Sequence, residues 1–252
     1  MTTAYDALMA FTRDTEALGQ IAGRLGWDQE TTMPRGAAAQ RSEEIGVLES
    51  VLHARRMDPR VADWLAEAEA TSDEAKAHLR HIRRSFERAS KVPGDLAAEL
   101  ARTTSVAQGI WAEARANDDF AAFAPTLERV LELRRQEGAA LADGGDPYDA
   151  LLQDYEPGAT AAELDAMFGA LRPRLVDLRD TVLGAPAPAE LTGSFDESAQ
   201  MKLSRQIAKT FGYDMSRGRV DKAVHPFSSG SGNDVRITTR TNPLDPFNCL
   251  YS

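Results

Sequence analysis

The sequence predicts a mainly α-helical, multi-helix array with a short β-hairpin or small sheet near its C-terminal end. Glycine and proline are sparse through the first 180 residues, and apolar residues recur there at steps of three and four. After Phe211 this helical periodicity stops. We therefore expect residues 1–252 to form a single helical region, with a possible loop or linker at 184–194, where proline, alanine and glycine are concentrated.

Local signals mark where the predicted helices begin and end. Asp58-Pro59 has the residue types of an N-cap and a first-turn proline, and Pro93-Gly94 makes a similar break. Capping boxes of the form Ser/Thr-x-x-Glu predict three further helix starts, at Thr71–Glu74, Thr160–Glu163 and Ser194–Glu197. These signals divide the chain before Gly212 into about eight helices.

The longest apolar stripe follows the capping box at Thr160. Its members lie three or four residues apart and share one helix face: Leu164, Met167, Phe168, Leu171, Leu175, Leu178 and Val182. Pro173 falls inside the stripe, so we expect a kink or a break into two helices there. Gly184 stands where a C-cap would end this helical segment.

Two short strands are expected after Gly212, at Val220–Phe227 and Val235–Arg240. The glycine- and serine-rich segment between them, residues 228–233, predicts a hairpin with a mobile loop. Side chains alternate between the two faces of a strand, so one face of the second strand should carry Asp234, Arg236, Thr238 and Arg240.

This polar strand face is a candidate binding site. Arg236 could place its planar guanidinium on a substrate carboxylate, with Asp234 and Thr238 holding that plane. An edge strand whose polar face meets solvent gives the same pattern, and the spacing alone favours that simpler interpretation. Pro226 holds the preceding His225 extended and fixes the direction of its ring, although a hydrogen-bonded structural histidine fits the same position.

Composition and charge limit the classes of partner. The chain carries 29 Lys and Arg against 39 Asp and Glu, for a net charge of −10 and a pI near 5.0, so it lacks the basic surface of a nucleic-acid binder. No apolar run approaches the ~18 residues of a membrane-spanning helix, and the N-terminus does not resemble a signal peptide. The single Cys249 fits a reducing compartment. We expect a cytoplasmic protein with no nucleic acid and no membrane as partner.

A weaker candidate is a pair of histidines on one predicted helix. His78 and His81 lie three residues apart, one turn after Glu74, and could bind a metal ion. Both are expected on the solvated side of that helix, because its buried face is already occupied by Leu79, Ile82 and Phe86. This metal-binding interpretation is therefore a minor one.

Four segments together point to a known family. They are Trp27-Asp28-Gln29-Glu30-Thr31-Thr32-Met33-Pro34, the run Tyr148–Gly158 (YDALLQDYEPG), His225-Pro226-Phe227, and Asp234-Val235-Arg236-Ile237-Thr238. In this order and spacing the chain resembles the carboxypeptidase Taq family of metallocarboxypeptidases over essentially its whole length. The family carries Trp-Asp-x-x-Thr-x-Met-Pro, Tyr-Asp-x-Leu-Leu-x-x-Tyr-Glu-Pro-Gly, His-Pro-Phe and Asp-x-Arg-x-Thr at the matching places.

The resemblance implies a largely helical protein with a deep groove and a small sheet beside it. It implies removal of C-terminal amino acids from peptides by a divalent metal ion, commonly zinc or cobalt. The His-Pro-Phe and Asp-x-Arg-x-Thr motifs imply substrate contacts at the closed end of that groove, made here by His225, Pro226, Phe227, Asp234, Arg236 and Thr238.

One family motif is absent from these 252 residues. In the family the metal is held by His-Glu-x-Gly-His, which follows shortly after Asp-x-Arg-x-Thr, and by a later Glu; no His-Glu-x-x-His occurs here. We therefore expect the N-terminal half of a larger metallopeptidase fold, truncated before that motif. No catalytic residue and no metal ligand is assigned to the chain, and neither zinc nor cobalt is expected to bind it.

Two functions from different classes follow. By resemblance the chain belongs to a metallocarboxypeptidase that acts on peptides, and by itself it is expected to be catalytically incomplete. The alternative is a non-catalytic helical module for binding or dimerisation. A homo-oligomer is expected, because helices that pack against a missing half would leave an apolar patch exposed.

Overall fold

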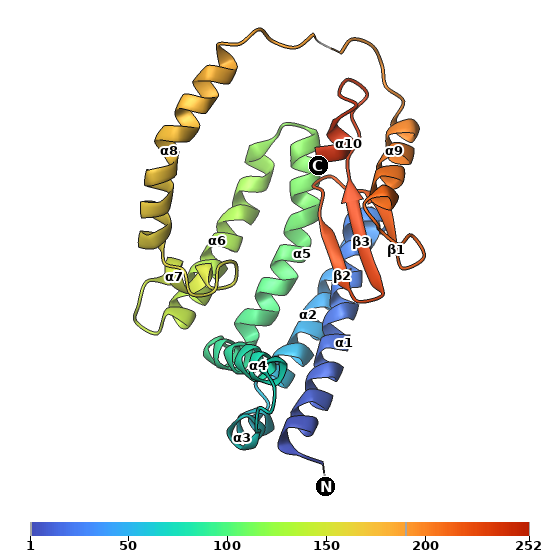
Figure 1. The fold of residues 1–252 in the computed structure, drawn as a ribbon. Coiled ribbons are helices and arrows are strands. Elements are labelled where there is room, and N and C mark those ends of the chain that lie inside the picture. Colours follow the sequence, from blue (N-terminus) through green and yellow to red (C-terminus); the bar gives the residue numbers. More distant parts are fainter. Residues whose placement is uncertain (1, 190, 252) are drawn as a thin grey trace. The chain divides into compact units, whose positions relative to one another are not determined.

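The computed structural model describes residues 2–189 and 191–251 and is mainly α-helical, which confirms the predicted fold class (Figure 1). Within the described residues, nine α-helices precede Gly212, and a short 3-10 helix at Arg35–Ala37 precedes the second of them. The helices are α1 (Ala4–Thr31), α2 (Ala38–Arg56), α3 (Pro59–Glu67), α4 (Asp73–Lys91), α5 (Gly94–Ala116), α6 (Phe120–Ala142), α7 (Pro147–Leu152), α8 (Ala161–Leu183), α9 (Glu197–Thr210) and the C-terminal α10 (Asn248–Tyr251).

The chain forms two compact units. The first contains the residues up to Arg134 and those from Phe195 onward, and the second is Arg135–Ser194; α6 passes from the first into the second. The described residues of the 184–194 segment form neither helix nor strand, and residue 190 lies outside the described residues. In the part of the chain that the structure describes, no helix combines the length and the apolar character needed to cross a membrane.

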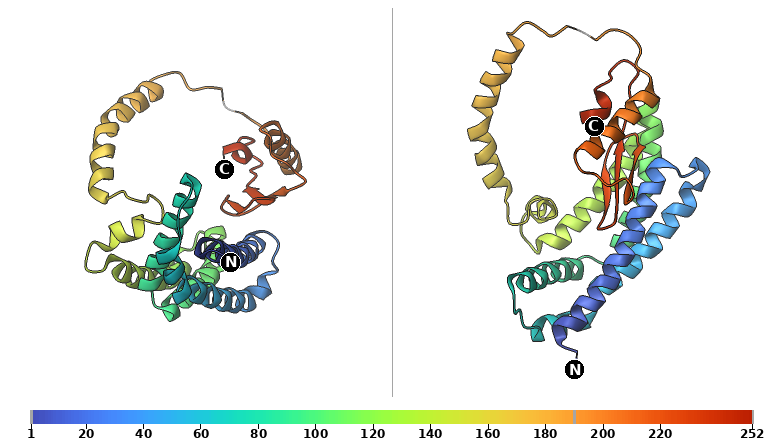
Figure 2. Two further views of the ribbon diagram at one scale, coloured as in Figure 1. Left: turned by 60° about the horizontal axis from the view of Figure 1, so that its bottom comes forward. Right: turned by 45° about the vertical axis from the view of Figure 1, so that its right-hand side comes forward.

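Helices α1, α2 and α5 form the frame of the first unit (Figure 2). Polar side chains join these helices at buried positions. Ser42 of α2 donates its hydroxyl to the Arg102 carbonyl of α5 at 3.1 Å. Gln29 and Ser105 form a reciprocal pair, in which Gln29 Nε2 donates to the Ser105 carbonyl at 2.6 Å and Ser105 Oγ donates to Gln29 Oε1 at 2.9 Å. This pair fixes the C-terminal end of α1 against α5.

An apolar cluster holds the opposite end of α1. Leu8 of α1 and Val61 and Leu65 of α3 are all less than 5% exposed. Partly buried side chains of α1, α3 and α4 pack against them: Phe11, Trp64, Leu79, Ile82 and Phe86. The rings of Phe11 and Trp64 lie 5.5 Å apart in a tilted arrangement. The two ends of α1 are therefore anchored by different chemistry, polar pairing at one and apolar packing at the other.

Most of the predicted helix boundaries are confirmed, and two are shifted. Asp58 caps α3 by accepting the Arg60 N–H, and Thr160 with Glu163 forms a complete capping box at the start of α8. The N-cap of α4 is Ser72 rather than Thr71, and the N-cap of α9 is Asp196 rather than Ser194. In both cases a second side chain with a capping oxygen lies within two residues, so residue type alone does not select between them.

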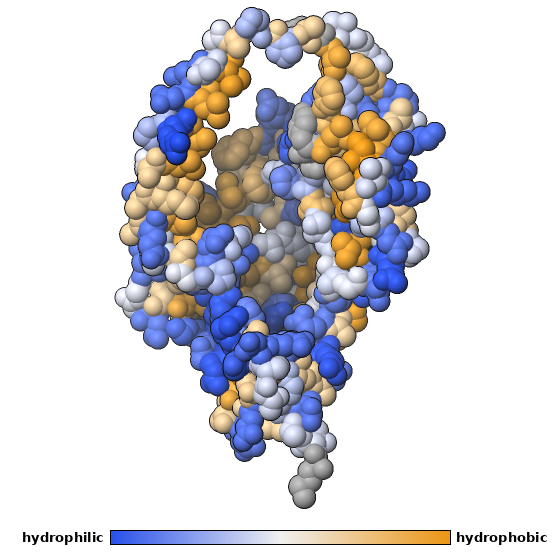
Figure 3. Space-filling view, in the orientation of Figure 1, coloured by the Kyte–Doolittle hydropathy of each residue, from blue (hydrophilic) through white to orange (hydrophobic). Residues whose placement is uncertain are grey.

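The second unit contains α7 and α8. Helix α8 is continuous through Pro173, so the predicted break into two helices is wrong. Proline removes one helical hydrogen bond, and the turns on either side keep theirs. The predicted apolar stripe is present, but six of its seven members are exposed: Met167, Phe168, Leu171, Leu175, Leu178 and Val182 are each 45% to 62% exposed, and Leu164 is half-buried. Figure 3 shows the corresponding hydrophobic band along one side of this helix.

The predicted small sheet is confirmed and has three strands in the order β1-β3-β2: β1 (Gly218–Lys222), β3 (Asp234–Thr239) and β2 (Ser228–Ser231). The central β3 pairs in parallel with β1 and antiparallel with β2. Gly232 and Asn233 form the turn between β2 and β3, and Gly232 has a φ of 59°, which suits a two-residue hairpin turn.

Two details of the predicted strands are wrong. The first strand ends at Lys222, so His225 lies outside any strand. The serine- and glycine-rich segment, predicted to be a mobile loop, supplies β2. Serine and glycine have a low strand preference, and pairing with β3 overrides it here. Gly230 lies opposite Val235 with a φ of 87°, and a Cβ at this position would overlap the Asp234 carbonyl.

We expect Gly218→Ala to destabilise the first unit by about 3 kcal/mol, because a close-packed site has no room for a methyl group. A Cβ at Gly218 would overlap both the Val235 carbonyl and the Tyr213 hydroxyl, which donates to that carbonyl at 2.5 Å. Urea unfolding monitored by circular dichroism measures the change.

The matched control is Gly109→Ala in α5, where no heavy atom lies within 4 Å of the added Cβ. Alanine in a helix interior should raise stability by about 0.5–1 kcal/mol. Equal effects of the two substitutions would contradict a tight contact at Gly218.

Candidate functional site

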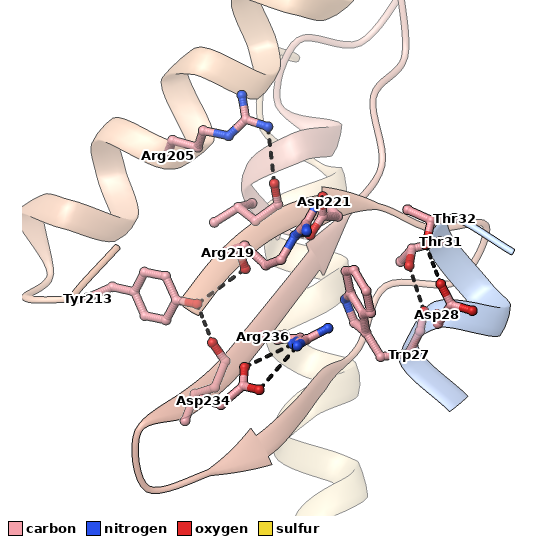
Figure 4. Close-up of polar contacts among 12 residues, drawn as sticks. Trp27, Asp28, Thr31, Thr32, Arg205, Tyr213, Arg219, Asp221, Asp234 and Arg236 are labelled. Carbon is pink, nitrogen blue, oxygen red and sulfur yellow. Dashed lines mark hydrogen bonds and ion pairs between the residues drawn. The ribbon is translucent and has the colours of Figure 1, made fainter. Parts of the chain in front are cut away.

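Trp27, near the C-terminal end of α1, lies against the sheet of the first unit (Figure 4). It is 5% exposed. The guanidinium carbon of Arg236 on β3 lies 4.1 Å from the centre of its ring, and that of Arg219 on β1 lies 4.8 Å away. Both distances fit cation–π contacts, which strengthen when the cation is partly desolvated. Within the described residues, the buried Trp27 Nε1 has no hydrogen-bond partner.

Arg236 is held in place by its own strand. Its Nε donates to Asp234 Oδ1 at 2.9 Å and its Nη2 donates to Asp234 Oδ2 at 3.1 Å, so the guanidinium and the carboxylate share one plane. The Arg236 side chain is only 18% exposed, and β3 is the central strand. The simpler interpretation of a solvated edge strand is therefore wrong. Nη1 takes part in neither of these two bonds.

Asp234 carries more than one interaction. Its hydrogen bond from Arg236 holds the pKa of the Asp234 carboxyl below its usual value, and Arg24 of α1, at 3.6 Å, acts in the same direction. Arg24 lies one turn of α1 before Trp27, so the same helix face contacts the sheet twice.

Thr238 has a different role from the one predicted. Instead of holding the Arg236 plane, its buried hydroxyl accepts the Phe227 N–H at 2.7 Å and donates to the Phe227 carbonyl at 2.8 Å. The Thr238 N–H also donates to that carbonyl at 2.8 Å. Thr238 thus ties the His225-Pro226-Phe227 segment to β3 and brings the two predicted motifs together.

His225 is exposed and lies beside α5. Its ring is 6.5 Å from the Trp111 ring, in an edge-to-face arrangement, and the guanidinium of Arg115 lies 5.4 Å from that indole. Burial raises the pKa of the Glu30 carboxyl at the end of α1, and the charge of His225 opposes that rise. His225 therefore lies near an indole of α5 and a carboxylate of α1.

A polar network fixes the end of α1 that presents Trp27. The Thr32 hydroxyl donates to Asp28 Oδ1 at 2.5 Å, and Arg41 Nη2 donates to Asp28 Oδ2 at 2.7 Å. Arg41 Nη1 also donates to the Leu25 carbonyl at 2.6 Å. The Thr32 bond first, and Arg41 second, hold the pKa of Asp28 below its usual value. The Trp27–Pro34 motif therefore forms a helix end that is held by its own Thr32 and by Arg41 of α2.

The Tyr148–Gly158 segment lies in the second unit, where it links α7 to α8. Asp149 Oδ1 accepts the Ala161 N–H at 2.7 Å, and Gln153 bonds both the Ala159 carbonyl and the Gly158 N–H. Its two tyrosines are 64% and 83% exposed. These hydrogen bonds fix the turn that leads from α7 into the first residues of α8.

Several residues of the site were missed by sequence reasoning. Trp27 and Glu30 were matched only as members of a motif, and Arg24 had no signal of its own. The period of α1 carries one usable signal, because Arg24, Trp27, Asp28 and Thr31 lie three or four residues apart on one face. Nothing in the sequence pairs that face with a strand 200 residues later.

The grouping of these motifs agrees with comparisons to known proteins. A family model for the carboxypeptidase Taq (M32) metallopeptidases matches residues 7–252. The chain belongs to this family. Thermostable carboxypeptidase 1 from Thermus thermophilus is 36% identical over 256 residues, covering 94% of this chain and 50% of that protein. The M32 carboxypeptidase from Deinococcus radiodurans R1 is 33% identical with a TM-score of 0.81, over 98% of this chain and 51% of that one.

A crystal structure of BsuCP is 26% identical with a TM-score of 0.91, over 98% of this chain and 51% of that one. This M32 chain therefore spans about half the length of the relatives it matches. Its helical array and small sheet are those of the M32 carboxypeptidases.

Membership of a metallopeptidase family implies a metal cofactor. Throughout residues 2–189 and 191–251, no group of three or more His, Cys, Asp or Glu side chains is placed to hold a metal ion. His78 Nδ1 is hydrogen-bonded to the Tyr5 hydroxyl at 2.9 Å, and His81 is exposed, so the minor interpretation of a site with Glu74 gains no support. The residues present do not fit the metal, and no chemical step through it is assigned to them.

We expect Asp28→Asn to lower the free energy of unfolding at pH 7 by up to about 1 kcal/mol, since this 35% exposed carboxylate is partly screened by solvent. A pKa that is lower in the folded chain stabilises the fold above the ordinary value of 3.8, and this contribution is lost as the pH falls below that value. Urea unfolding at pH 7, 5 and 3 measures the difference.

The control is Asp14→Asn, at an exposed position of the same helix. It should change stability little at any of these pH values. A deficit of Asp28→Asn that persists unchanged at pH 3 would show that the carboxylate charge is not its cause.

Proposed function

We propose that this chain supplies one half of a metallocarboxypeptidase, which releases C-terminal amino acids from peptides. Family membership and the relatives' names support this proposal. The main supporting observation is that two family motifs lie side by side in the structure. Thr238 binds the His225-Pro226-Phe227 segment to β3, the strand that carries Arg236. The chain would provide a substrate-binding wall, while zinc or cobalt and its ligands would belong to the complete protein.

Arg236 is the anion contact in this proposal. Asp234 occupies Nε and Nη2, and Trp27 covers one side of the guanidinium, so the group is oriented before any ligand arrives. Nη1 remains to donate to a peptide carboxylate, and a charge-assisted bond of this kind is stronger than a neutral one. Pre-orientation also lowers the entropy lost on binding.

The remaining predicted residues shape the wall around that contact. Pro226 fixes the extended direction of the segment, Phe227 is held by Thr238, and His225 stays exposed beside Trp111. The exposed imidazole of His225 and the aromatic rings of Phe227 and Trp111 would contact the part of the peptide next to its carboxylate. In this proposal the chain binds and orients substrate and leaves bond cleavage to the complete protein.

We expect Arg236→Ala to lower kcat/KM about tenfold to a hundredfold, the usual effect of losing a charged hydrogen bond. The measurement uses a polypeptide that joins residues 1–252 to the second half of the Thermus thermophilus relative. Metal content should not change. Arg236→Lys should restore little, because lysine lacks the planar fork.

Arg219→Ala is the matched control, because Arg219 also contacts the Trp27 ring but directs its own fork to Asp221. It should reduce kcat/KM far less than Arg236→Ala. Unaltered kcat/KM in Arg236→Ala would argue that this arginine only supports the sheet.

The 252-residue chain alone should bind neither zinc nor cobalt stoichiometrically and should release no C-terminal amino acid above background. A catalytic zinc site needs three protein ligands and a carboxylate base, and the four histidines of this chain include no His-Glu-x-x-His. Metal analysis and peptide digests followed by mass spectrometry test this. Chelator-sensitive activity that survives removal of contaminating proteases would overturn it.

The chain should also self-associate at micromolar concentration through α8. Its exposed apolar stripe is an unusual surface for a soluble monomer. Leu175→Glu, at a stripe position that is 51% exposed, should shift the chain toward monomer in light scattering. Val47→Glu, at a position on α2 that is 62% exposed, should have no such effect. A monomeric wild-type chain would contradict this expectation.

A further inference from the structure

A cavity of about 450 Å³ lies among α1, α2, α3 and α4 in the first unit. Its wall is largely apolar, with Phe11, Val61, Ile82 and Phe86 as the main contributors. Val61 is buried, and the other three are half-buried against the apolar cluster of this unit. Cavities of this volume with mostly apolar walls and a few fixed polar groups are the usual sites of small organic ligands.

Arg55 is the fixed polar group of this cavity. Its Nε donates to Thr15 Oγ1 at 3.0 Å, its Nη2 donates to the Phe11 carbonyl at 3.0 Å, and its guanidinium lies 4.1 Å from the centre of the Phe11 ring. All of these partners are neutral. In the part of the chain that the structure describes, Arg55 enters no ion pair.

The neighbouring carboxylate does not neutralise Arg55. Asp58 is held by Arg60 through two side-chain bonds, at 2.7 and 3.0 Å, and Arg60 is also the first cause of its lowered pKa. Arg55 makes the smallest of the contributions to that lowering. The cavity wall therefore carries an oriented cation that lacks a counter-charge of its own.

Five further titratable groups line the cavity. They are Arg13, Arg56, His78, His81 and Glu16. Arg56 is paired with Glu49 at 2.8 Å, His78 is bonded to Tyr5, and Glu16 is exposed. Three arginines, Arg13, Arg55 and Arg56, and one carboxylate, Glu16, thus line an apolar cavity in a chain with a net charge of −10.

We propose that this cavity binds a small amphipathic carboxylate, with its apolar body on Phe11, Ile82 and Phe86 and its carboxylate on Nη1 of Arg55. The geometry suits a monoanion, because one guanidinium is available and the rest of the wall is apolar. Arg55 is already held by three contacts, so little further side-chain entropy is lost when the ligand binds.

The cavity is separate from the site at the sheet. Glu16 is the cavity residue that lies nearest to Trp27 along α1, and the step of 11 residues from Glu16 to Trp27 corresponds to about 16 Å. The cavity therefore stands independently of the proposed peptidase function, and its ligand would not compete directly with a peptide at Arg236.

Calorimetric titration of the 252-residue chain with octanoate tests the proposal. Octylammonium has the same apolar body and the opposite charge, so it serves as the matched ligand. Octanoate should bind at least tenfold more tightly than octylammonium. Equal affinity for the two, or no octanoate binding at millimolar concentration, would overturn the proposal.

Two variants assign the binding to this cavity. Arg55→Gln removes the charge and should weaken octanoate about tenfold or more. Ser85→Trp, at an exposed lining position, should block the cavity and abolish binding while Arg55 stays in place. Lys76→Gln is the control, because Lys76 is an exposed cation on α4 that does not line the cavity.

Circular dichroism and thermal unfolding show whether each variant folds. If Arg55→Gln does not fold, Ser85→Trp alone decides, and binding that survives it overturns the proposal. Octanoate affinity that falls as protein concentration rises would mean that a second copy of the chain occupies the cavity, which also overturns it.

Discussion

The stacking of Arg236 and Arg219 on Trp27 is the interaction on which the site depends. It joins the end of a 28-residue helix to a sheet formed almost 200 residues later. Each such contact contributes about 0.5–2 kcal/mol, more when the cation is desolvated. The buried Trp27 N–H has no partner in the described structure, so these contacts also offset the cost of burying it. Without the indole, both guanidinium groups would lose the ring that they lie against.

The aspartates of the sheet orient the two arginines that stack on Trp27. Asp234 and Asp221 each lie two residues from an arginine on the same strand, and a bidentate hydrogen bond from that arginine fixes the orientation of its guanidinium plane. A flat guanidinium can lie on an aromatic ring, whereas a lysine ammonium in the same place would be a point charge. The aspartate of the Asp-x-Arg pattern therefore orients Arg236 for packing on Trp27. Only Nη1 of Arg236 is then available to bind a ligand in the proposed function.

The second unit shows how much of a helix local sequence signals determine. Helix α8 has a complete capping box and a continuous helix, yet its apolar stripe is exposed from Met167 to Val182. Local signals are sufficient to form this helix, because capping and propensity act within a few residues. Covering its stripe requires another surface, and the relatives are about twice as long as this chain.

The sequence by itself determined the helical class, most helix boundaries, the presence of a small sheet and, through four motifs, the family. These properties depend on residue type and spacing within a few helical turns, and residues that close in sequence are always close in space. Only the tertiary structure decided that Ser228–Ser231 is a strand, that Thr238 holds Phe227 rather than Arg236, and that Trp27 lies under the arginines. Each of these outcomes depends on which segment, distant in sequence, packs against the residue in the folded chain. Strand pairing and ring stacking gain their free energy from contacts between segments far apart in sequence, so no local pattern encodes them.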